Sequence, residues 1–229
     1  MRRRIWIWVS VPFLALLAGC SGGDGERSLQ QETFTILQKE IQSRLARKRT
    51  VAPEPVTRAK VEALNISILE VTLERAGVVG YGGLIEARKD SRLGNIAVWR
   101  TDDGFSLSTR NGVLVATRGF GGDVLSSQVP VRGTAPGPAF GGEHVQMIRA
   151  LDDRQVSVGF GCDLVDLGPE TLEILGHRHT TRHVQEQCEA RKGQVVNDYW
   201  VEARTGFVRQ SRQWAGPEIG YLKTRRLTD

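Results

Sequence analysis

The stretch Trp99–Val124, which reads WRTDDGFSLSTRNGVLVATRGFGGDV, decides the fold class of this chain. It contains two turn signals, Asp103–Gly104 and Asn111–Gly112, whose residue types accept the positive φ angles that tight hairpin turns require. Between these turns apolar and polar side chains alternate from Phe105 to Arg110, which is the period of a strand with one buried face. The stretch therefore predicts a meander of three antiparallel strands.

Strand-like segments continue toward both ends of the chain, separated by turn signals. The expected strands cover 66–73, 96–99, 144–151, 155–164, 171–175, 181–188, 195–203, 207–214 and 219–227. We expect Gly77–Gly83 to be a glycine-rich break. Gly119–Gly142 is expected to be a long loop with one helical turn near Gly122–Ser126, where a partner or ligand can touch. Many short strands at near-regular spacing predict a mainly β protein, with an antiparallel barrel-like or sandwich fold.

The first twenty residues resemble the signal peptide of a bacterial lipoprotein. Arg2–Arg4 form a positively charged start, and Ile5–Leu17 is apolar except for Ser10 and Pro12. As a helix this segment spans about 20 Å, too short for a permanent membrane span. Leu17–Cys20 reads LAGC and matches a lipobox, so we predict a signal peptide over 1–19 and a lipid on Cys20. The alternative is an ordinary signal peptide with a chance cysteine.

The mature chain is expected to have three parts. Residues 20–27 form a lipidated tether, residues 28–55 a helix and linker, and residues 56–229 the antiparallel β domain. Apolar residues at spacings of three and four predict one amphipathic helix over Ser28–Arg49, whose basic end either complements the helix dipole or contacts anionic lipid or polysaccharide. Because Ser21 and not Asp follows Cys20, analogy with enteric bacteria places the protein at the outer membrane, facing the periplasm.

The net charge of the chain gives no reason to expect a nucleic-acid partner. Lys and Arg number 31 and Asp and Glu 26, for a formal charge of +5. Removing residues 1–19 removes three Arg and no acid, which leaves 28 against 26 and a charge of +2. The basic isoelectric point is thus partly a property of the signal peptide, and no nucleic-acid motif is present.

Two cysteines remain after lipidation, Cys162 and Cys188, which lie 26 residues apart on expected strands. An oxidising compartment permits a disulfide between them, but the sequence does not show that their Cβ atoms meet, so two buried thiols remain the alternative.

Three histidines, His177, His179 and His183, would project from one face of a regular strand. Neutral imidazoles on one face can bind zinc together with a nearby carboxylate, such as Glu186 or Glu189. The arginines between them disfavour a cation, so we expect neither a metal nor a cofactor. His144 is isolated in the sequence and is expected to be a core or edge residue.

No stretch of the chain carries a recognisable catalytic motif. Asp102–Asp103 and Asp152–Asp153 are adjacent in turns, where acids shape or solvate the turn rather than face each other across a sugar. The nucleophile elbow and the phosphate-binding loop are both missing. We therefore assign no catalytic residues.

Two stretches resemble the YjbF/GfcB family of lipoproteins, which is linked to exopolysaccharide and group 4 capsule production. The first is Trp99–Val124, and the second is Asn197–Gly206, NDYWVEARTG, continuing through Ser211–Pro217, SRQWAGP. The sequence departs from the family pattern at Val113, where Arg is expected, and at Phe207–Arg209. The resemblance implies a barrel-like fold of antiparallel strands, and it supplies no catalytic residues to carry over.

The resulting hypothesis is a non-enzymatic outer-membrane lipoprotein that assists secretion or assembly of an exopolysaccharide or capsule. Its partners would be the membrane, through the N-terminal lipid, and either the polysaccharide export machinery or the polysaccharide itself. Candidate contact residues are Trp99, Trp200, Trp214, Arg209, Arg212, Arg225 and Arg226. The alternatives are core packing for the tryptophans and a solvated face for the arginines. Rival functions are a polysaccharide-modifying hydrolase or lyase and a carrier of lipid or lipoprotein.

Overall fold

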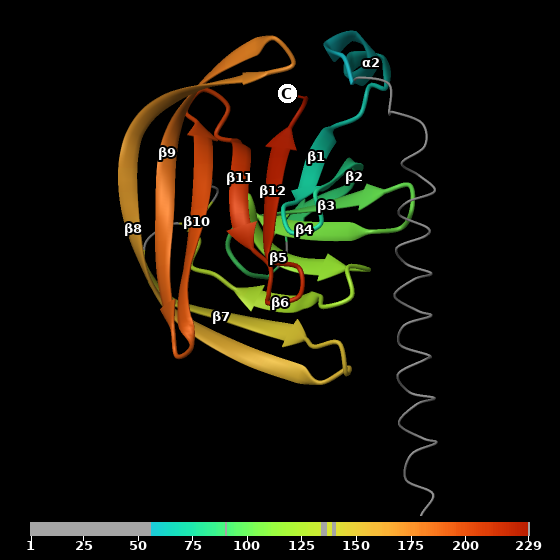
Figure 1. Cartoon of the computed structure of the whole chain (residues 1–229). Coiled ribbons are helices and arrows are strands. Elements are labelled where there is room, and N and C mark those ends of the chain that lie inside the picture. The colour runs from blue at the N-terminus through green and yellow to red at the C-terminus, as the bar shows by residue number, and fades with distance from the viewer. Residues whose placement is uncertain (1–55, 90, 134–136, 139–140, 229) are drawn as a thin grey trace, which may run out of the picture. The chain divides into compact units, whose positions relative to one another are not determined.

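A single antiparallel sheet of 12 strands, curved into a nearly closed barrel, dominates the computed structural model (Figure 1). The structure describes residues 56–89, 91–133, 137–138 and 141–228. The strands are β1 Ile68–Leu73, β2 Val78–Lys89, β3 Asn95–Thr101, β4 Ser106–Arg110, β5 Val113–Arg118, β6 Val124–Gln128, β7 Gly142–Arg149, β8 Gln155–Ile174, β9 His177–Ala190, β10 Gly193–Glu202, β11 Val208–Trp214 and β12 Tyr221–Arg226. The prediction of a mainly β, antiparallel, barrel-like fold is confirmed.

Strand order explains how the barrel nearly closes. Consecutive strands pair in the order β5-β4-β3-β2-β1-β12-β11-β10-β9-β8-β7-β6, so β1 and β12 join the two ends of the described chain. Among the described residues no ladder joins β5 to β6. Side chains bridge this seam instead, because Thr117 Oγ1 donates to Asp123 Oδ1 at 2.9 Å and accepts from the Val124 amide at 2.9 Å.

The predicted three-strand meander is confirmed as β3, β4 and β5. Its second turn has positive φ at both central residues, +50° at Asn111 and +88° at Gly112. This turn also lies against β11, since a Cβ added at Gly112 would be 2.4 Å from Val208 Cγ2. Glycine is required here for both the backbone conformation and the close approach.

Three sequence-based expectations about strand boundaries are wrong. Gly77–Gly83 is mostly strand, because β2 pairs with β1 on one side and β3 on the other, and this tertiary pairing overrides the low strand propensity of glycine. The expected loop over Gly119–Gly142 contains β6 where a helical turn was predicted. β8 continues past Leu164 to Ile174, because a register shift between Asp166 and Gly168 bends the strand without ending it.

The domain that begins at residue 56 starts with a short helix, α2 Arg58–Ala63, which the sequence did not predict. Thr57 caps this helix, since its side chain accepts from the Lys60 amide, and Val61 packs with Ile68, Ile174 and Leu227. None of the described helical residues forms a helix long and apolar enough to cross a membrane. Cys20, the tether and the amphipathic helix predicted over Ser28–Arg49 lie outside the described residues.

The barrel interior is divided between apolar and polar side chains. The larger apolar cluster consists of Leu69, Val71, Trp99, Leu107, Leu114, Val124, Ala215, Ile219 and Leu222. The inward-facing positions of β10 and β11 are mostly polar and buried: Asn197, Tyr199, Arg209, Ser211 and Gln213. Gln213 crosses the interior, because its Nε2 donates to the Gly112 carbonyl at 3.0 Å and its Oε1 accepts from the Leu114 amide at 2.7 Å. Buried polar groups, which are costly unless paired, therefore organise this part of the core.

Candidate functional site

A row of cross-strand neighbours runs over the outside of the barrel from β9 to β2. We call it the outer row, and its members are His183, Trp200, Gln210, Arg225, Glu70 and Tyr81. Their chain neighbours Tyr199, Ser211 and Val71 are buried, so the alternation of a strand directs the row outward. Five interstrand spacings give the row a length of about 24 Å.

Trp200 occupies one end of the outer row and is held by polar neighbours. Its indole stacks on the His183 ring at a centroid distance of 4.3 Å and an interplanar angle of 16°. The indole Nε1 donates to Glu170 Oε2 at 2.8 Å. The His183 ring lies between two carboxylates, with Nε2 2.9 Å from Asp198 Oδ1 and Nδ1 3.3 Å from Glu170 Oε2. This end thus combines a fixed aromatic ring with hydrogen-bonding groups.

Two arginines of this face, Arg225 and Arg212, are paired with carboxylates. Arg225 Nε lies 3.0 Å from Glu70 Oε1. Beside the row, Arg212 donates to both oxygens of Glu74 at 3.0 Å and stacks on Tyr221 at 3.6 Å. Burial lowers the Arg212 pKa, but the Glu74 carboxylate outweighs it and raises the pKa above its ordinary value. The face therefore offers paired donors and acceptors, not a strip of uncompensated positive charge.

The seven predicted contact residues do not form one surface. Trp99 is 4% exposed within the apolar core, and Arg209 is 1% exposed, so burial excludes both from direct contact with a polymer. This corrects the prediction for these two residues. Trp214 and Arg226 are half-buried; the Trp214 ring packs edge-on against Phe160 at 5.6 Å.

Trp200, Arg212 and Arg225 do lie together on the outer face. Sequence reasoning missed their neighbours Gln210, Glu70 and Tyr81. The alternation along each strand would have predicted that their side chains point away from the buried face. Only the register between strands that are distant in sequence brings them into one row.

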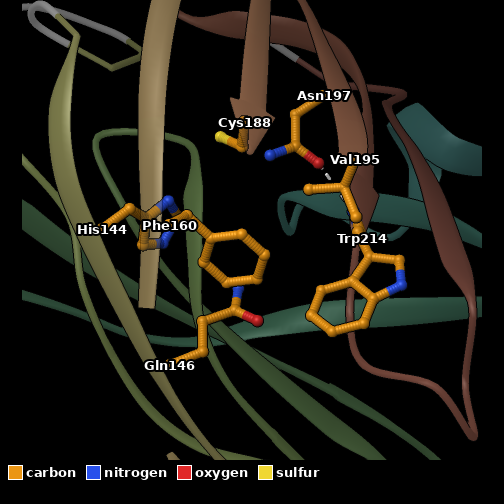
Figure 2. A pocket seen from close by; sticks show the side chains of 7 residues that line it. All are labelled: His144, Gln146, Phe160, Cys188, Val195, Asn197 and Trp214. Atoms are coloured by element: carbon orange, nitrogen blue, oxygen red, sulfur yellow. Dashed lines mark hydrogen bonds between the residues drawn. The ribbon is translucent and has the colours of Figure 1, made fainter. Parts of the chain in front are cut away.

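A narrow hollow lies among side chains that come from strands β7 to β11 (Figure 2). Its lining residues are His144, Gln146, Phe160, Cys188, Val195, Asn197 and Trp214. The hollow is too narrow to admit a water molecule, so neither a sugar ring nor a lipid chain fits in it. Three of its lining residues, His144, Gln146 and Asn197, are polar and buried, and His144 and Asn197 belong to a second group of interacting side chains.

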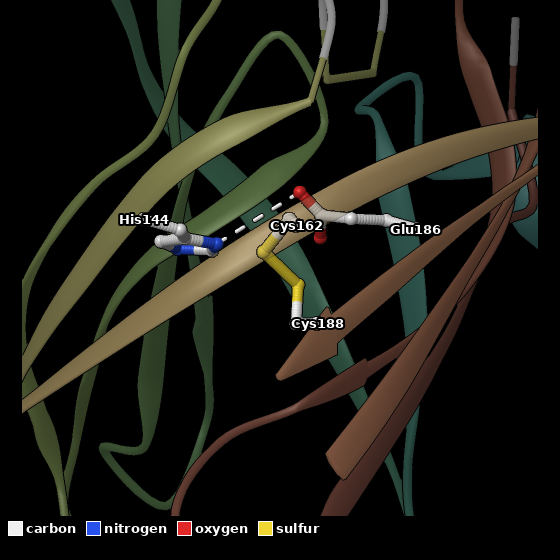
Figure 3. A group of neighbouring side chains, drawn as sticks. All are labelled: His144, Cys162, Glu186 and Cys188. Carbon is white, nitrogen blue, oxygen red and sulfur yellow. Dashed lines mark ion pairs between the residues drawn. A yellow bond between two sulfur atoms is a disulfide. The ribbon is translucent and has the colours of Figure 1, made fainter. Parts of the chain in front are cut away.

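That buried group surrounds a disulfide between Cys162 and Cys188, which are direct partners on β8 and β9 with an S–S distance of 2.06 Å (Figure 3). His144 Nδ1 lies 3.8 Å from Glu186 Oε1. His144 Nε2 is 2.7 Å from Ser127 Oγ. His144 is therefore a core residue that contacts a carboxylate. It is isolated in the sequence, but not in the folded structure.

Burial controls the protonation of this pair. It lowers the pKa of His144 to about 4, so the imidazole is neutral at pH 7. Burial also raises the pKa of Glu186, and the hydrogen bonds from Asn197 and Tyr199 offset this only in part. The Asn197 Nδ2 donor lies 2.8 Å from Glu186 Oε2. Neither Asn197 nor Tyr199, the two hydrogen-bond donors to Glu186, carries a positive charge.

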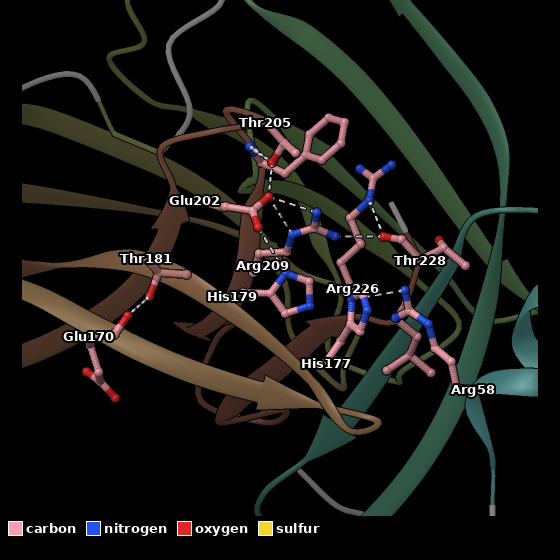
Figure 4. Close-up of polar contacts among 12 residues, drawn as sticks. Arg58, Glu170, His177, His179, Thr181, Glu202, Thr205, Arg209, Arg226 and Thr228 are labelled. Atoms are coloured by element: carbon pink, nitrogen blue, oxygen red, sulfur yellow. Dashed lines mark hydrogen bonds and ion pairs between the residues drawn. The ribbon is translucent and has the colours of Figure 1, made fainter.

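A second buried carboxylate, Glu202, has the opposite surroundings (Figure 4). Arg209 Nη2 donates to Glu202 Oε2 at 2.8 Å, and Thr205 donates to the same oxygen. His179 Nδ1 lies 2.9 Å from Glu202 Oε1. Burial would raise the Glu202 pKa, but the hydrogen bonds from Thr205, His179 and Arg209 and the charge of Arg209 lower it to about 2.

The three histidines considered as zinc ligands are thus divided between environments. His179 is buried against Glu202, and His183, a member of the outer row, contacts Trp200 and Asp198. His177 is exposed, with Nδ1 3.4 Å from Arg58 Nη2. The expectation that all three share one face is wrong, because the buried positions of β9 change from odd to even residue numbers between His179 and Glu186.

Comparison with known proteins identifies the family of the chain and a solved structure with a similar fold. The family described as group 4 capsule polysaccharide lipoprotein gfcB, YjbF matches residues 32–227. The crystal structure of the hypothetical lipoprotein YmcC from Escherichia coli (K12) is 22% identical in sequence, with a TM-score of 0.63. That alignment covers 76% of this chain and 89% of the YmcC chain, and it supports the fold alone. None of the curated proteins compared with the chain matches it.

Proposed function

Because the chain belongs to the YjbF family of group 4 capsule polysaccharide lipoproteins, we propose that it is a non-enzymatic accessory factor in exopolysaccharide or capsule secretion or assembly. In this proposal the lipid on Cys20 anchors it to the outer membrane, with the barrel facing the periplasm. The observation that carries the proposal is the family match over residues 32–227, which includes almost all of the described barrel.

The outer row is the surface that we assign to the polymer or to a protein of the export machinery. A fixed indole at Trp200 offers an apolar ring to the apolar face of a pyranose. Beside it, Asp198, Arg225 and Glu70 offer acceptors and donors that match sugar hydroxyls. Since the arginines are paired with carboxylates, we expect recognition of hydroxyl groups to matter more than attraction to an anionic chain.

The interior supports a binding role more than a catalytic one. Glu202 is engaged by Arg209, and Glu186 is enclosed by Asn197 and Tyr199. Both carboxylates are buried, with Glu186 0% and Glu202 4% exposed, so neither is placed to act as an acid or base on a glycosidic bond of a polymer at the surface. The lipid-carrier alternative requires an aliphatic cavity, whereas polar side chains fill this part of the barrel.

The anchored role is tested in a deletion strain complemented with the wild type or with Cys20→Ala. Surface-bound and released polysaccharide are both measured, together with polymer chain length. We expect polymer to fall in the deletion strain and to be restored only by the form that carries the lipid. A change in chain length at constant amount would favour the hydrolase or lyase, and unchanged polymer would leave the lipid carrier to be tested by native mass spectrometry.

The outer row is tested by measuring the affinity of the purified chain for the strain's own polymer. Trp200→Leu should weaken binding about 10-fold, as loss of one aromatic contact does, while Trp200→Phe keeps the ring and most of the affinity. Arg225→Ala should also weaken it, because it removes the donor of the Arg225–Glu70 pair. Arg154→Ala is the matched control, because Arg154 is also paired with a carboxylate, that of Asp152, but lies off the row. Equal affinity in all variants would remove the outer row from the proposal.

A further inference from the structure

The surroundings of the disulfide contain a complete set of metal-ligating atoms. His144, Cys162, Glu186 and Cys188 are all buried, and each offers one ligand atom; these four atoms lie within 4.8 Å of one another (Figure 3). They come from three adjacent strands, His144 from β7, Cys162 from β8, and Glu186 and Cys188 from β9. Two thiolates, an imidazole and a carboxylate form a donor set that zinc takes in proteins.

Two of these atoms are left without a hydrogen-bond partner. They are His144 Nδ1 and Glu186 Oε1, and both are fully buried in residues at most 3% exposed. Buried polar atoms are rarely left unpaired, because an unmade hydrogen bond costs about 1–3 kcal/mol. The two atoms lie 3.8 Å apart beside the sulfur atoms. Their position therefore points to a ligand that is shared between them.

The remaining atoms of the same side chains are already fixed. His144 Nε2 is 2.7 Å from Ser127 Oγ, and Glu186 Oε2 accepts from Asn197 Nδ2 at 2.8 Å. Such contacts orient ligands around protein metal sites and set which ring nitrogen is free to bind. Here they leave Nδ1 and Oε1 as the free atoms on both side chains.

The dimensions of the group suit a tetrahedral ion once the sulfur atoms separate. Zinc bonds of 2.0–2.3 Å place neighbouring ligand atoms about 3.3–3.8 Å apart. Nδ1 and Oε1, whose bonds to zinc are the shorter ones, are 3.8 Å apart and would have to approach each other by about 0.4 Å. The two sulfur atoms are too close for a tetrahedral site while they are bonded to each other, and reduction removes that bond.

We propose that reduction of the Cys162–Cys188 disulfide converts this group into a zinc site with ligands Cys162 Sγ, Cys188 Sγ, His144 Nδ1 and Glu186 Oε1. A dithiol reductant supplies two electrons and two protons, becomes a disulfide itself and leaves two cysteine thiols. Zn²⁺ then displaces both thiol protons and binds two thiolates, one neutral imidazole and one carboxylate. The disulfide and the metal are mutually exclusive states of one centre.

The exchange has a structural consequence. The disulfide joins β8 to β9, whereas the metal would also tie in β7 through His144. In the reduced protein the metal would therefore replace the covalent link between β8 and β9 that the disulfide provides. This inference does not depend on the role proposed for the outer row.

The test compares oxidised and reduced full-length protein, purified in detergent. Zinc affinity is measured by competition with a chromophoric chelator, with a phosphine as the reductant. Co²⁺ is used in parallel, because thiolate-to-cobalt absorption reports sulfur ligation directly. We expect one equivalent of metal in the reduced protein, cobalt–thiolate bands, and no comparable binding in the oxidised protein. Reduced wild type that binds no tighter than oxidised protein would overturn the proposal.

Variants separate this site from adventitious binding. Cys162→Ala with Cys188→Ala should abolish tight binding while keeping Cys20, and His144→Ala or Glu186→Gln should weaken it about 100-fold or more, since even loss of a residue behind a ligand costs 10–100-fold. His183→Asn is the matched control, because His183 also lies between carboxylates but has no cysteine nearby. If His144→Ala and Glu186→Gln bind like wild type, the proposed ligand set is wrong.

Folding provides a second readout. If the reduced protein unfolds without metal, circular dichroism should show that Zn²⁺ restores the β structure of the wild type, because metal binding is then coupled to folding. It should not restore the double alanine variant. Failure of Zn²⁺ to refold the unfolded, reduced wild type would contradict the proposal.

Discussion

Glu186 and Glu202 are both buried inside the barrel and both lie beside a histidine, yet they have opposite electrostatic surroundings. Glu202 accepts from Arg209 and has its pKa lowered to about 2. Glu186 accepts from an amide and a phenol, and burial raises its pKa. A buried charge needs a counter-charge, and only Glu202 has one among its described neighbours.

The difference separates a carboxylate that stabilises the fold from one that is open to a ligand. Around Glu202 both oxygens are engaged, by His179, Thr205 and Arg209. Around Glu186 one oxygen remains unpaired next to the disulfide. Substitutions and pH changes at each carboxylate should therefore have different effects on stability.

Removing the counter-charge of Glu202 should have the largest effect. Arg209→Met leaves a buried carboxylate without its cation and should lower the free energy of unfolding by about 3–5 kcal/mol. Urea denaturation followed by circular dichroism measures this value. Glu186→Gln is the matched comparison and should cost about 1 kcal/mol or less, because no ion pair is broken. Equal losses would mean that the two carboxylates do not differ as described.

Removing the disulfide beside Glu186 should lower the free energy of unfolding without any change of charge. Cys162→Ala with Cys188→Ala opens a loop spanning 26 residues and should cost about 3 kcal/mol in zinc-free buffer, by the entropy of loop closure. Guanidinium denaturation of the oxidised wild type and the double variant gives the difference. A loss well under 1 kcal/mol would show that pairing of β8 with β9 already restrains the unfolded chain.

Acid should destabilise the protein by protonating Glu202. The folded pKa, about 2, lies below the ordinary value of 4.5, so the stability from ionised Glu202 is fully present above about pH 4.5. It is lost as the pH falls toward 2, by about 3 kcal/mol at most. Thermal melting between pH 5 and 2 should therefore fall more steeply in wild type than in Glu202→Gln. Parallel curves would assign the acid sensitivity to other groups.

The smallest effect is expected at the Asn111–Gly112 turn, whose Gly112 carbonyl accepts a hydrogen bond from Gln213. Gln213 in turn contacts Tyr199, which donates to Glu186. Gly112 and Gly104 both have a φ of +88°, but only Gly112 lies against Val208. Gly112→Ala should therefore lose about 1–3 kcal/mol more than Gly104→Ala, which reports backbone strain alone. Thermal melts of the two variants give this difference. An equal loss would show that β11 moves to accommodate the methyl group.

Local sequence patterns were sufficient to predict much of the strand content and the meander from β3 to β5. Strand alternation and turn chemistry are properties of a few neighbouring residues, so Asn111–Gly112 was enough to locate a hairpin. The same reasoning failed for β2, because its glycines become strand through pairing with β1 and β3. It also failed for the far end of β8, where a bulge continues the strand past Asp166.

The amino-acid sequence alone was enough to identify a lipobox-like start, a β pattern, two cysteines and a set of aromatic and basic side chains near the C-terminus. The tertiary structure alone decided their partners. Trp99 and Arg209 became buried, Trp200 and Arg225 joined one outer row, and His144 met Glu186 from 42 positions away in the chain. The physical reason is that register and strand curvature set contacts between distant segments, and such contacts leave no periodic trace in the sequence.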